Sequence, residues 1–315
     1  MVATVAAHQG STGPDARVIA VDVGGTKTRG AVVTRAGAIE ERFERATEAS
    51  SEEALLASLD GLIEGLRAEA DVAALGIGVP SRIDQRRGRS LVAVNLPLDG
   101  VDLRDRMWAR HDLPVGIDND ANAAAIGEWN AGAARGADNV VMLTLGTGVG
   151  GGLIVDGRPF RGATGSGAEL GHIVIDVDGP PCPCGGNGHL EAYACGPVAD
   201  RVARELFGEE SDAEDLVERA RAGDSRAVEA LAGLGSKLGA GIATFVNVFE
   251  PELVVIGGGF GAAAGDLLFG PAREVVAREG LEPGRDTVRI VEAELGVDAG
   301  VIGAALIGFE ALDGN

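Results

Sequence analysis

Two thiols, two imidazoles and two carboxylates lie close together in one short stretch of this sequence. The stretch contains Glu169-Leu-Gly-His172 and, after a gap, Cys182-Pro-Cys184-Gly-Gly-Asn-Gly-His189-Leu-Glu191. Thiolate sulfur and neutral imidazole nitrogen together suit Zn²⁺, and a structural zinc site takes four protein ligands. The sequence therefore predicts a zinc site whose ligands are His172, Cys182, Cys184 and His189. The alternative is a turn rich in proline and glycine, with two reduced cysteines and two unrelated histidines.

Two glycine-rich turns follow short apolar segments that are far apart in the chain. Residues 18–23 lead into Asp22-Val-Gly-Gly-Thr-Lys-Thr28, and residues 140–145 lead into Gly146-Thr-Gly-Val-Gly-Gly-Gly152. Each pattern is typical of a strand, a tight turn and a second strand. Aligning 22–33 with 144–155 matches glycine to glycine, which indicates an internal duplication.

Backbone N–H groups in such turns bind phosphate oxygens, so two hairpins facing each other would hold the phosphates of a nucleotide. The spacing is not that of a Walker A loop, and the glycines lead into a strand rather than the helix of a dinucleotide-binding fold. A third run, Gly257-Gly-Gly259, ends an apolar strand where backbone can approach a ligand. The predicted nucleotide-binding residues are Asp22, Gly24, Gly25, Thr26, Lys27, Gly146, Thr147, Gly148, Gly258 and Gly259. The alternative is that the glycines form tight corners only.

Two carboxylates at strand ends have types suited to phosphoryl transfer. Asp22 ends the first strand beside the predicted phosphates and suits a role in holding hydrated Mg²⁺, unless it only bonds the turn amides. A second cluster, Asp118-Asn-Asp-Ala-Asn122, stands between a strand at 115–118 and a helix beginning near Ala121. Asp120 could cap this helix, but capping needs one such residue and the cluster has four. We therefore favour Asp120 as the general base that accepts a hydroxyl proton.

Composition narrows the class of protein. The 315 residues, 45% of them hydrophobic, allow a large core and usually mean two domains. A net charge of −21 argues against a nucleic-acid partner, because phosphate backbones are bound by clustered lysine and arginine. No run approaches the roughly eighteen apolar residues of a membrane span, so we expect a cytoplasmic protein without a membrane partner. Residues 1–17 are small and polar and predict a disordered tail.

Strand and helix patterns alternate along the chain, which indicates an α/β fold. Apolar strands are expected at 73–79, 252–257 and 287–292. Helices are expected at 52–69, at about 225–249 and at about 300–312.

Taken together, these motifs resemble the ROK family of sugar kinases and repressors, and within it the glucokinases. The resemblance runs from about residue 18 to the end and includes Gly76-Ile-Gly-Val-Pro80 and Asn95-Leu-Pro97. It implies a duplicated actin-like, hexokinase-type (ribonuclease H-like) fold of two lobes around a central cleft, with ATP between the lobes and a hexose at the hinge. It also implies that Asp120 is the catalytic base and that His172 ligates zinc. The implied sugar ligands are Asn95, Asn119, Asp120, Glu169, His172 and Glu191.

Two residues depart from the family pattern. His189 stands where a third cysteine is usual in the zinc sequence, and Ser81 stands where a glycine usually follows the proline. Histidine can replace cysteine on zinc with a slightly shorter bond and one negative charge fewer, so the zinc prediction is kept. We attach no consequence to Ser81.

The expected function is that of an ATP-dependent kinase acting on the 6-hydroxyl of glucose, with Mg²⁺ and the turn amides stabilising the developing charge. Zinc would only stiffen the loop 172–191. The expected lobes are a small one at 18–120, joined by a C-terminal helix at 300–315, and a large one at 121–299. The resemblance also implies a homodimer or homotetramer.

Several alternatives stay open at this point. N-acetylmannosamine, N-acetylglucosamine or fructose are alternative substrates, and ADP or polyphosphate are alternative donors. A sugar-responsive repressor would add an N-terminal helix-turn-helix domain, for which about seventeen residues are too few. An actin-like ATPase would leave the cluster at 169–191 without a purpose.

Overall fold

The computed structural model describes residues 13–93 and 95–314, which divide into two compact units. Unit 1 comprises the described residues up to Gly127 together with 161–167 and 297 onward, and unit 2 comprises 128–160 and 168–296. The boundary predicted after Asp120 differs from this division because α3, Asp120–Ala131, is one continuous helix whose first part belongs to unit 1.

The predicted disordered tail, 1–17, is too long. Residues 1–12 lie outside the described residues. Ala16, however, is buried, and its carbonyl oxygen accepts a hydrogen bond from the backbone N–H of Arg35 at 3.1 Å. Arg17 already begins the first strand, so pairing and burial order this end of the predicted tail.

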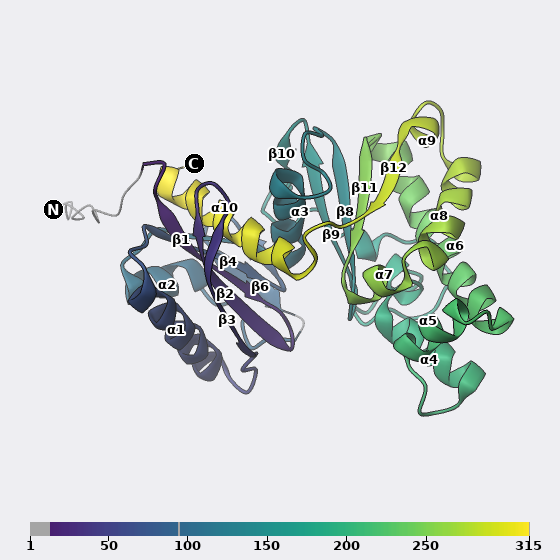
Figure 1. The fold of residues 1–315 in the computed structure, drawn as a ribbon, viewed down its shortest axis with the longest axis horizontal. Helices are drawn as coiled ribbons and strands as arrows, with labels where there is room; N and C mark the ends of the chain where they lie inside the picture. The colour runs from purple at the N-terminus through teal and green to yellow at the C-terminus, as the bar shows by residue number, and fades with distance from the viewer. Residues whose placement is uncertain (1–12, 94, 315) are drawn as a thin grey trace. The chain divides into compact units, whose positions relative to one another are not determined.

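Unit 1 is built on a five-stranded sheet with the order β3-β2-β1-β4-β7. Figure 1 shows α1 and α2 on one side of this sheet and the C-terminal helix α10 on the other. A separate hairpin, β5 and β6, precedes α2. The bounds are β1 Arg17–Val23, β2 Lys27–Thr34, β3 Ile39–Ala46, α1 Glu52–Glu69, β4 Ala74–Val79, β5 Ser81–Asp84, β6 Arg89–Ala93, α2 Leu103–His111, β7 Val115–Asn119 and α10 Ala299–Asp313.

The two faces of the unit 1 sheet are covered differently. Ile19 and Val21 of β1 pack into a core of large side chains with α1, whereas Val18 and Ala20 point to the opposite face and pack with α10. Contact with α10 is close because glycines stand where the backbones meet. A Cβ on Gly76 of β4, for example, would collide with a carbonyl oxygen of α10. Such glycines allow close packing of a helix on a sheet.

Unit 2 repeats this sheet. Its strand order is β10-β9-β8-β11-β12, and in both sheets the first two pairings are antiparallel and the last two parallel. Helices α4 to α9 belong to the same unit as this sheet (Figure 1). The repeat confirms both the α/β class and the duplication. The bounds are β8 Val140–Leu145, β9 Val149–Val155, β10 Arg158–Pro159, α4 Gly196–Phe207, α5 Ala213–Arg221, α6 Ser225–Phe249, β11 Leu253–Gly257, α7 Gly259–Ala264, α8 Asp266–Glu279, α9 Gly284–Thr287 and β12 Arg289–Glu292.

The two glycine hairpins match in their strand ends and differ in their turns. β1 ends at Val23 and β2 begins at Lys27, which are the positions aligned with the end of β8 and the start of β9. In the first turn Gly24 N donates to Lys27 O at 2.9 Å, whereas in the second Gly146 N donates to Gly148 O at 3.0 Å. The second turn is therefore closed one residue earlier, a detail that the aligned glycines do not indicate.

Among the described residues, α6 is the one helix with the length and mean hydropathy of a membrane span. Its apolar side chains, such as Leu238, Ile242 and Phe245, are buried in the core of unit 2, which also contains residues of β8 and β11. This burial is typical of the central helix of a folded domain.

A buried ion pair joins three separate segments of unit 1. The side chain of Asp118, at the end of β7, is completely buried. Its Oδ2 accepts a hydrogen bond from Arg161 Nε at 2.5 Å, and Arg161 Nη2 donates to Glu310 Oε2 of α10 at 3.1 Å. This contact explains why the segment 161–167 belongs to unit 1, because a buried carboxylate needs a cation close by.

Removing this cation should destabilise the protein strongly. We expect Arg161→Leu to lower the free energy of unfolding by about 3–5 kcal/mol, because it leaves the Asp118 charge buried and unpaired. The matched control is Arg158→Leu, which removes an exposed arginine of β10 and should cost less than about 1 kcal/mol. Urea unfolding followed by circular dichroism measures both. Equal losses for the two variants would contradict the role given to the buried pair.

Candidate active site

Two carboxylates of unit 1, Asp22 near the end of β1 and Asp120 directly after β7, lie on either side of β4. Gly78 of β4 separates them: a Cβ there would lie 3.6 Å from Asp120 Cα and 3.8 Å from Asp22 Oδ1. Gly300, at the start of α10, leaves room for the Asp22 carboxylate, since a Cβ would lie 2.6 Å from its carboxyl carbon. Removal from water and, second, the charge of Asp120 raise the pKa of Asp22 to about 7.

The capping alternative for Asp120 is weakened by the geometry of the helix start. Asn119 Oδ1 accepts hydrogen bonds from the backbone N–H groups of Ala121 at 2.9 Å and Asn122 at 3.2 Å. Asp120 Oδ1 accepts from Ala121 N at 3.0 Å. Asn119 therefore provides the main cap of α3. Asp120, the first residue of the helix, stands beside Asp22 with a carboxylate suited to accept a proton.

Asn119 is itself held by its surroundings. Its Nδ2 donates to the carbonyl oxygen of Ser81 at 3.3 Å, and the buried hydroxyls of Ser81 and Ser90 are 2.5 Å apart. The unusual Ser81 thus takes part in a buried hydrogen bond of the β5–β6 hairpin. Asn95, another predicted sugar ligand, is exposed in the loop that follows β6.

The first glycine turn presents its tip to solvent. Gly25 and Thr26 are exposed, and Thr47 Oγ1 fastens the turn by donating to Gly24 O at 2.7 Å. Lys27, also a predicted nucleotide ligand, donates from Nζ to Glu44 Oε1 at 2.7 Å. The exposed amides suit a phosphate, whereas the lysine ammonium is engaged with β3.

In unit 2 the four predicted zinc ligands come together. One donor atom from each of His172, Cys182, Cys184 and His189 can be chosen so that all lie within 4.8 Å of one another. His172 Nδ1 is 3.7 Å from Cys182 Sγ, and His189 Nδ1 is 3.1 Å from Cys184 Sγ. Tetrahedral zinc with ordinary bond lengths places sulfur and nitrogen ligands about 3.6 Å apart. The donor set and its spacing therefore fit zinc.

The loop around these ligands is closed by its own backbone. Cys182 N donates to Gly186 O at 2.8 Å, and Gly185 N donates back to Cys182 O at 2.9 Å. Gly185 and Gly188 have φ values of 96° and 63°, which glycine adopts without strain. Burial raises the pKa of the Cys182 thiol to about 12, so its ionisation at neutral pH would depend on a bound metal.

Glu191 connects this cluster to the second glycine turn. Its Oε1 accepts from Cys182 Sγ at 3.5 Å, and its Oε2 accepts from the backbone N–H of Val149 at 2.9 Å. A side chain at Gly148 would collide with the same carboxylate. Glu169 is exposed immediately before the short helix Leu170–His172, which carries the predicted ligand His172.

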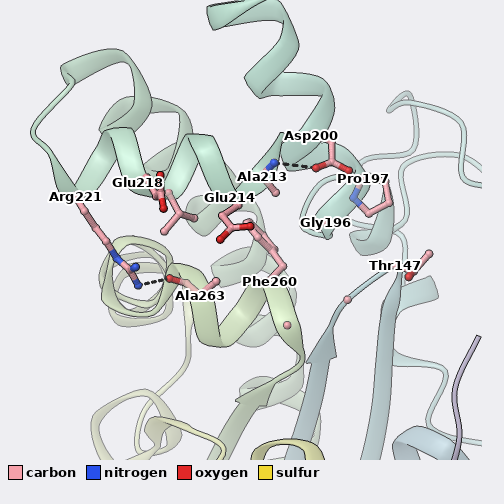
Figure 2. A pocket seen from close by; sticks show the side chains of 13 residues that line it. Thr147, Gly196, Pro197, Asp200, Ala213, Glu214, Glu218, Arg221, Phe260 and Ala263 are labelled. Atoms are coloured by element: carbon pink, nitrogen blue, oxygen red, sulfur yellow. Dashed lines mark hydrogen bonds between the residues drawn. The ribbon is translucent and has the colours of Figure 1, made fainter. Parts of the chain in front are cut away.

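A cavity of about 690 Å³ lies in unit 2, at the ends of β8 and β11. It brings the second glycine turn, through Gly146 and Thr147, together with Gly259 of the third run. Gly258 (φ 83°) packs its Cα against the backbone of Leu145, which explains the need for glycine there. Figure 2 shows the side chains that line the cavity, and its volume is that of a typical small-molecule site.

Most of this cavity lining is not indicated by the sequence. Asp200 of α4, Glu214 and Glu218 of α5, and Phe260 of α7 line the cavity, and none lies in a predicted motif. Asp200 Oδ1 accepts from Ala213 N at 2.8 Å and so joins α4 to the start of α5. Of these four residues, only Phe260 directly follows one of the glycine runs identified above, so only Phe260 could have been found from the sequence.

Comparison with known proteins agrees with the sequence motifs. The ROK family model matches residues 18–310. A glucokinase of Thermotoga maritima is 37% identical over 318 residues, covering 96% of this chain and 100% of the relative. Among solved structures, a ROK family glucokinase from Streptomyces griseus in complex with glucose and AMPPNP has a TM-score of 0.82 at 35% identity, covering 93% of this chain and 99% of that one. A ROK hexokinase from Thermus thermophilus has a TM-score of 0.84 at 33% identity, covering 95% and 100%.

These likenesses extend over nearly the whole length of each relative. They agree with the repeated sheet described above and confirm the predicted actin-like, hexokinase-type fold. The chain belongs to the ROK family.

Proposed function

We propose that this protein transfers the γ-phosphoryl group of Mg-ATP to the 6-hydroxyl of glucose. The observation that carries the proposal is the similarity, over nearly the full chain, to glucokinases, one of them solved with glucose and a nucleotide analogue. The site supports it independently, because unit 1 offers a carboxylate base and unit 2 a cavity beside glycine turns.

Asp120 is the general base in this proposal. It accepts the proton of the 6-hydroxyl as the oxygen attacks the γ-phosphorus, which is the role that phosphoryl transfer requires of a carboxylate. Asn95 and Asn119 of unit 1 bind other sugar hydroxyls, as do Glu169, His172 and Glu191 of unit 2. Asn119 is suited to this because its amide is already held by Ser81.

The phosphates of the nucleotide bind the exposed amides of the glycine turns. The turns are Gly24 to Thr26 in unit 1 and Gly146 to Gly148 in unit 2, with Gly258 and Gly259 behind the latter. The first amide of each turn closes the turn, so the amides of the next two residues bind phosphate. When Mg²⁺ is bound, it neutralises phosphate charge, and Asp22 is the residue suited to hold it through water. The nucleoside occupies the cavity lined by α4, α5 and α7.

Zinc has a structural role in the proposal. His172, Cys182, Cys184 and His189 would hold it, and it supplies rigidity rather than chemistry. The short helix Leu190–Ala192, which carries the predicted sugar ligand Glu191, begins directly after His189, so a fixed His189 restrains it. Assembly as a homodimer or homotetramer and a cytoplasmic location stay predictions.

Asp120→Asn should lower glucose-dependent ADP release by about 10²–10⁴-fold, because general base catalysis contributes that much. Glucose affinity, measured by calorimetry, should change little, since the amide keeps the shape of the carboxylate and one acceptor oxygen. Asp112→Asn, at the exposed end of α2, is the matched control and should turn over normally. An Asp120→Asn enzyme that retains more than about a hundredth of normal turnover would show that another group is the base.

Loss of zinc should weaken sugar binding before it unfolds the protein. We expect Cys184→Ala to lose bound zinc, measured by plasma mass spectrometry, and to raise the KM for glucose about tenfold or more. Cys195→Ala changes a buried cysteine outside the set of four and should keep its zinc. His189→Cys should also keep it, since thiolate is an equivalent ligand. Full activity of a preparation that contains no zinc, assayed with Mg-ATP, would refute the assignment.

Asp22 should make the stability of the nucleotide-free protein depend on pH. Its folded pKa of about 7 lies above the usual value near 3.9, so the folded protein holds a proton that the unfolded chain releases between these pH values. Stability contributed by this group is therefore present at low pH and lost as pH rises toward 7. Asparagine at position 22 does not titrate. The free energy of unfolding of Asp22→Asn, minus that of the parent, should therefore increase by about 2 kcal/mol between pH 5 and pH 8. Thermal melts without Mg²⁺ test this, and a constant difference would contradict it.

A further inference from the structure

The cavity of unit 2 carries an excess of negative charge. Asp200, Glu214 and Glu218 line it, and Arg221 is the one basic residue among the described residues of its lining. Arg221 Nη2 donates to the carbonyl oxygen of Ala263 at 2.7 Å, so part of its donor capacity is engaged with α7. Most of the charged side chains that line this cavity are therefore carboxylates, which accept hydrogen bonds.

The acidic groups of α5 are separated from the glycine turn along the cavity. Figure 2 shows Thr147 and Gly196 on one side, Glu218 and Arg221 on the other, and Glu214 with Phe260 between them. α4 begins at Gly196 beside this glycine turn, and Gly196 N donates to Gly146 O at 2.9 Å. A donor whose phosphates bind at this end extends its remaining part toward Glu214 and Glu218.

Two classes of phosphoryl donor differ in what that remaining part would be. In a nucleoside triphosphate the remaining part is the nucleoside, which is uncharged. Its ribose hydroxyls and the amino group of its base can donate hydrogen bonds to carboxylates, and its base can lie against the Phe260 ring. Inorganic polyphosphate has no donors and carries negative charge along its whole length. Its further phosphates would lie beside like charges, which repel one another at short range.

We propose that Glu214 and Glu218 are specificity-determining residues for the phosphoryl donor, which admit a nucleoside triphosphate and exclude inorganic polyphosphate. The inference rests on the proposed function and selects among the donors that the sequence leaves open. Both side chains are exposed to the cavity, and α5 is held by the bonds of Asp200 to Ala213 and of Arg221 to Ala263. The donor preference is therefore set by charge on a fixed helix.

The test measures kcat/KM for ATP and for long-chain polyphosphate, with glucose saturating, in the parent and in Glu214→Lys/Glu218→Lys. The parent should prefer ATP by at least about 100-fold. Reversing both charges should lower kcat/KM for ATP by about tenfold or more, because lysine cannot accept hydrogen bonds from the nucleoside. It should raise kcat/KM for polyphosphate by about tenfold or more, because opposite charges attract. The matched control, Glu229→Lys/Glu274→Lys, makes the same charge change on exposed faces of α6 and α8, outside the cavity lining. It should leave the donor ratio within about threefold of the parent.

The neutral variant Glu214→Gln/Glu218→Gln keeps the test decisive if the lysine variant does not fold. It should move the donor ratio in the same direction by at least about tenfold. A parent that uses polyphosphate as well as ATP, or substituted enzymes with an unchanged ratio, would overturn the inference while leaving glucose phosphorylation intact. A folded parent that phosphorylates glucose from neither donor would instead refute the proposed function.

Discussion

The buried charge of Asp118 is the constraint on which the proposed catalytic part of unit 1 depends. A carboxylate removed from water requires a cation and hydrogen-bond donors, and Asp118 receives them from Arg161, from the backbone N–H of Asn119 and from the Asn122 amide. These contacts tie the end of β7 to the first turn of α3. Asp120 stands between the tied residues, so its backbone position follows from the burial of its neighbour.

In unit 2 the comparable connection is made by Glu191. Its carboxylate contacts the cysteine cluster with one oxygen and the second glycine hairpin with the other. The hairpin has glycine at position 148 because this carboxylate occupies the space of a side chain. The predicted metal loop and the predicted phosphate turn are thus mechanically connected, although they belong to different sequence motifs. A rigid loop of this kind preorganises its ligands without taking part in the reaction.

Much of the fold could be predicted because its signals are local. The helices at Glu52–Glu69 and Ser225–Phe249 have the predicted bounds, since apolar periodicity and capping by Ser51 and Asp224 mark them within the sequence. The duplication was likewise visible in the spacing of glycines. The return of 161–167 to unit 1 could not be predicted, because it depends on an ion pair between residues distant in sequence. The earlier closure of the second turn depends on strand register, which glycine spacing does not determine.

By itself, the sequence determined the family, several of the strands and helices, and the set of residues able to take part in chemistry, because these follow from residue types at short spacing. The four thiol and imidazole groups are an example, since glycine turns bring near neighbours together. Tertiary structure alone decided the environment of Asp22, whose pKa depends on burial and on Asp120. It also decided the lining of the cavity in unit 2, because Asp200, Glu214 and Phe260 meet only when three helices pack on one sheet. Burial and packing involve the whole chain, and no local pattern encodes them.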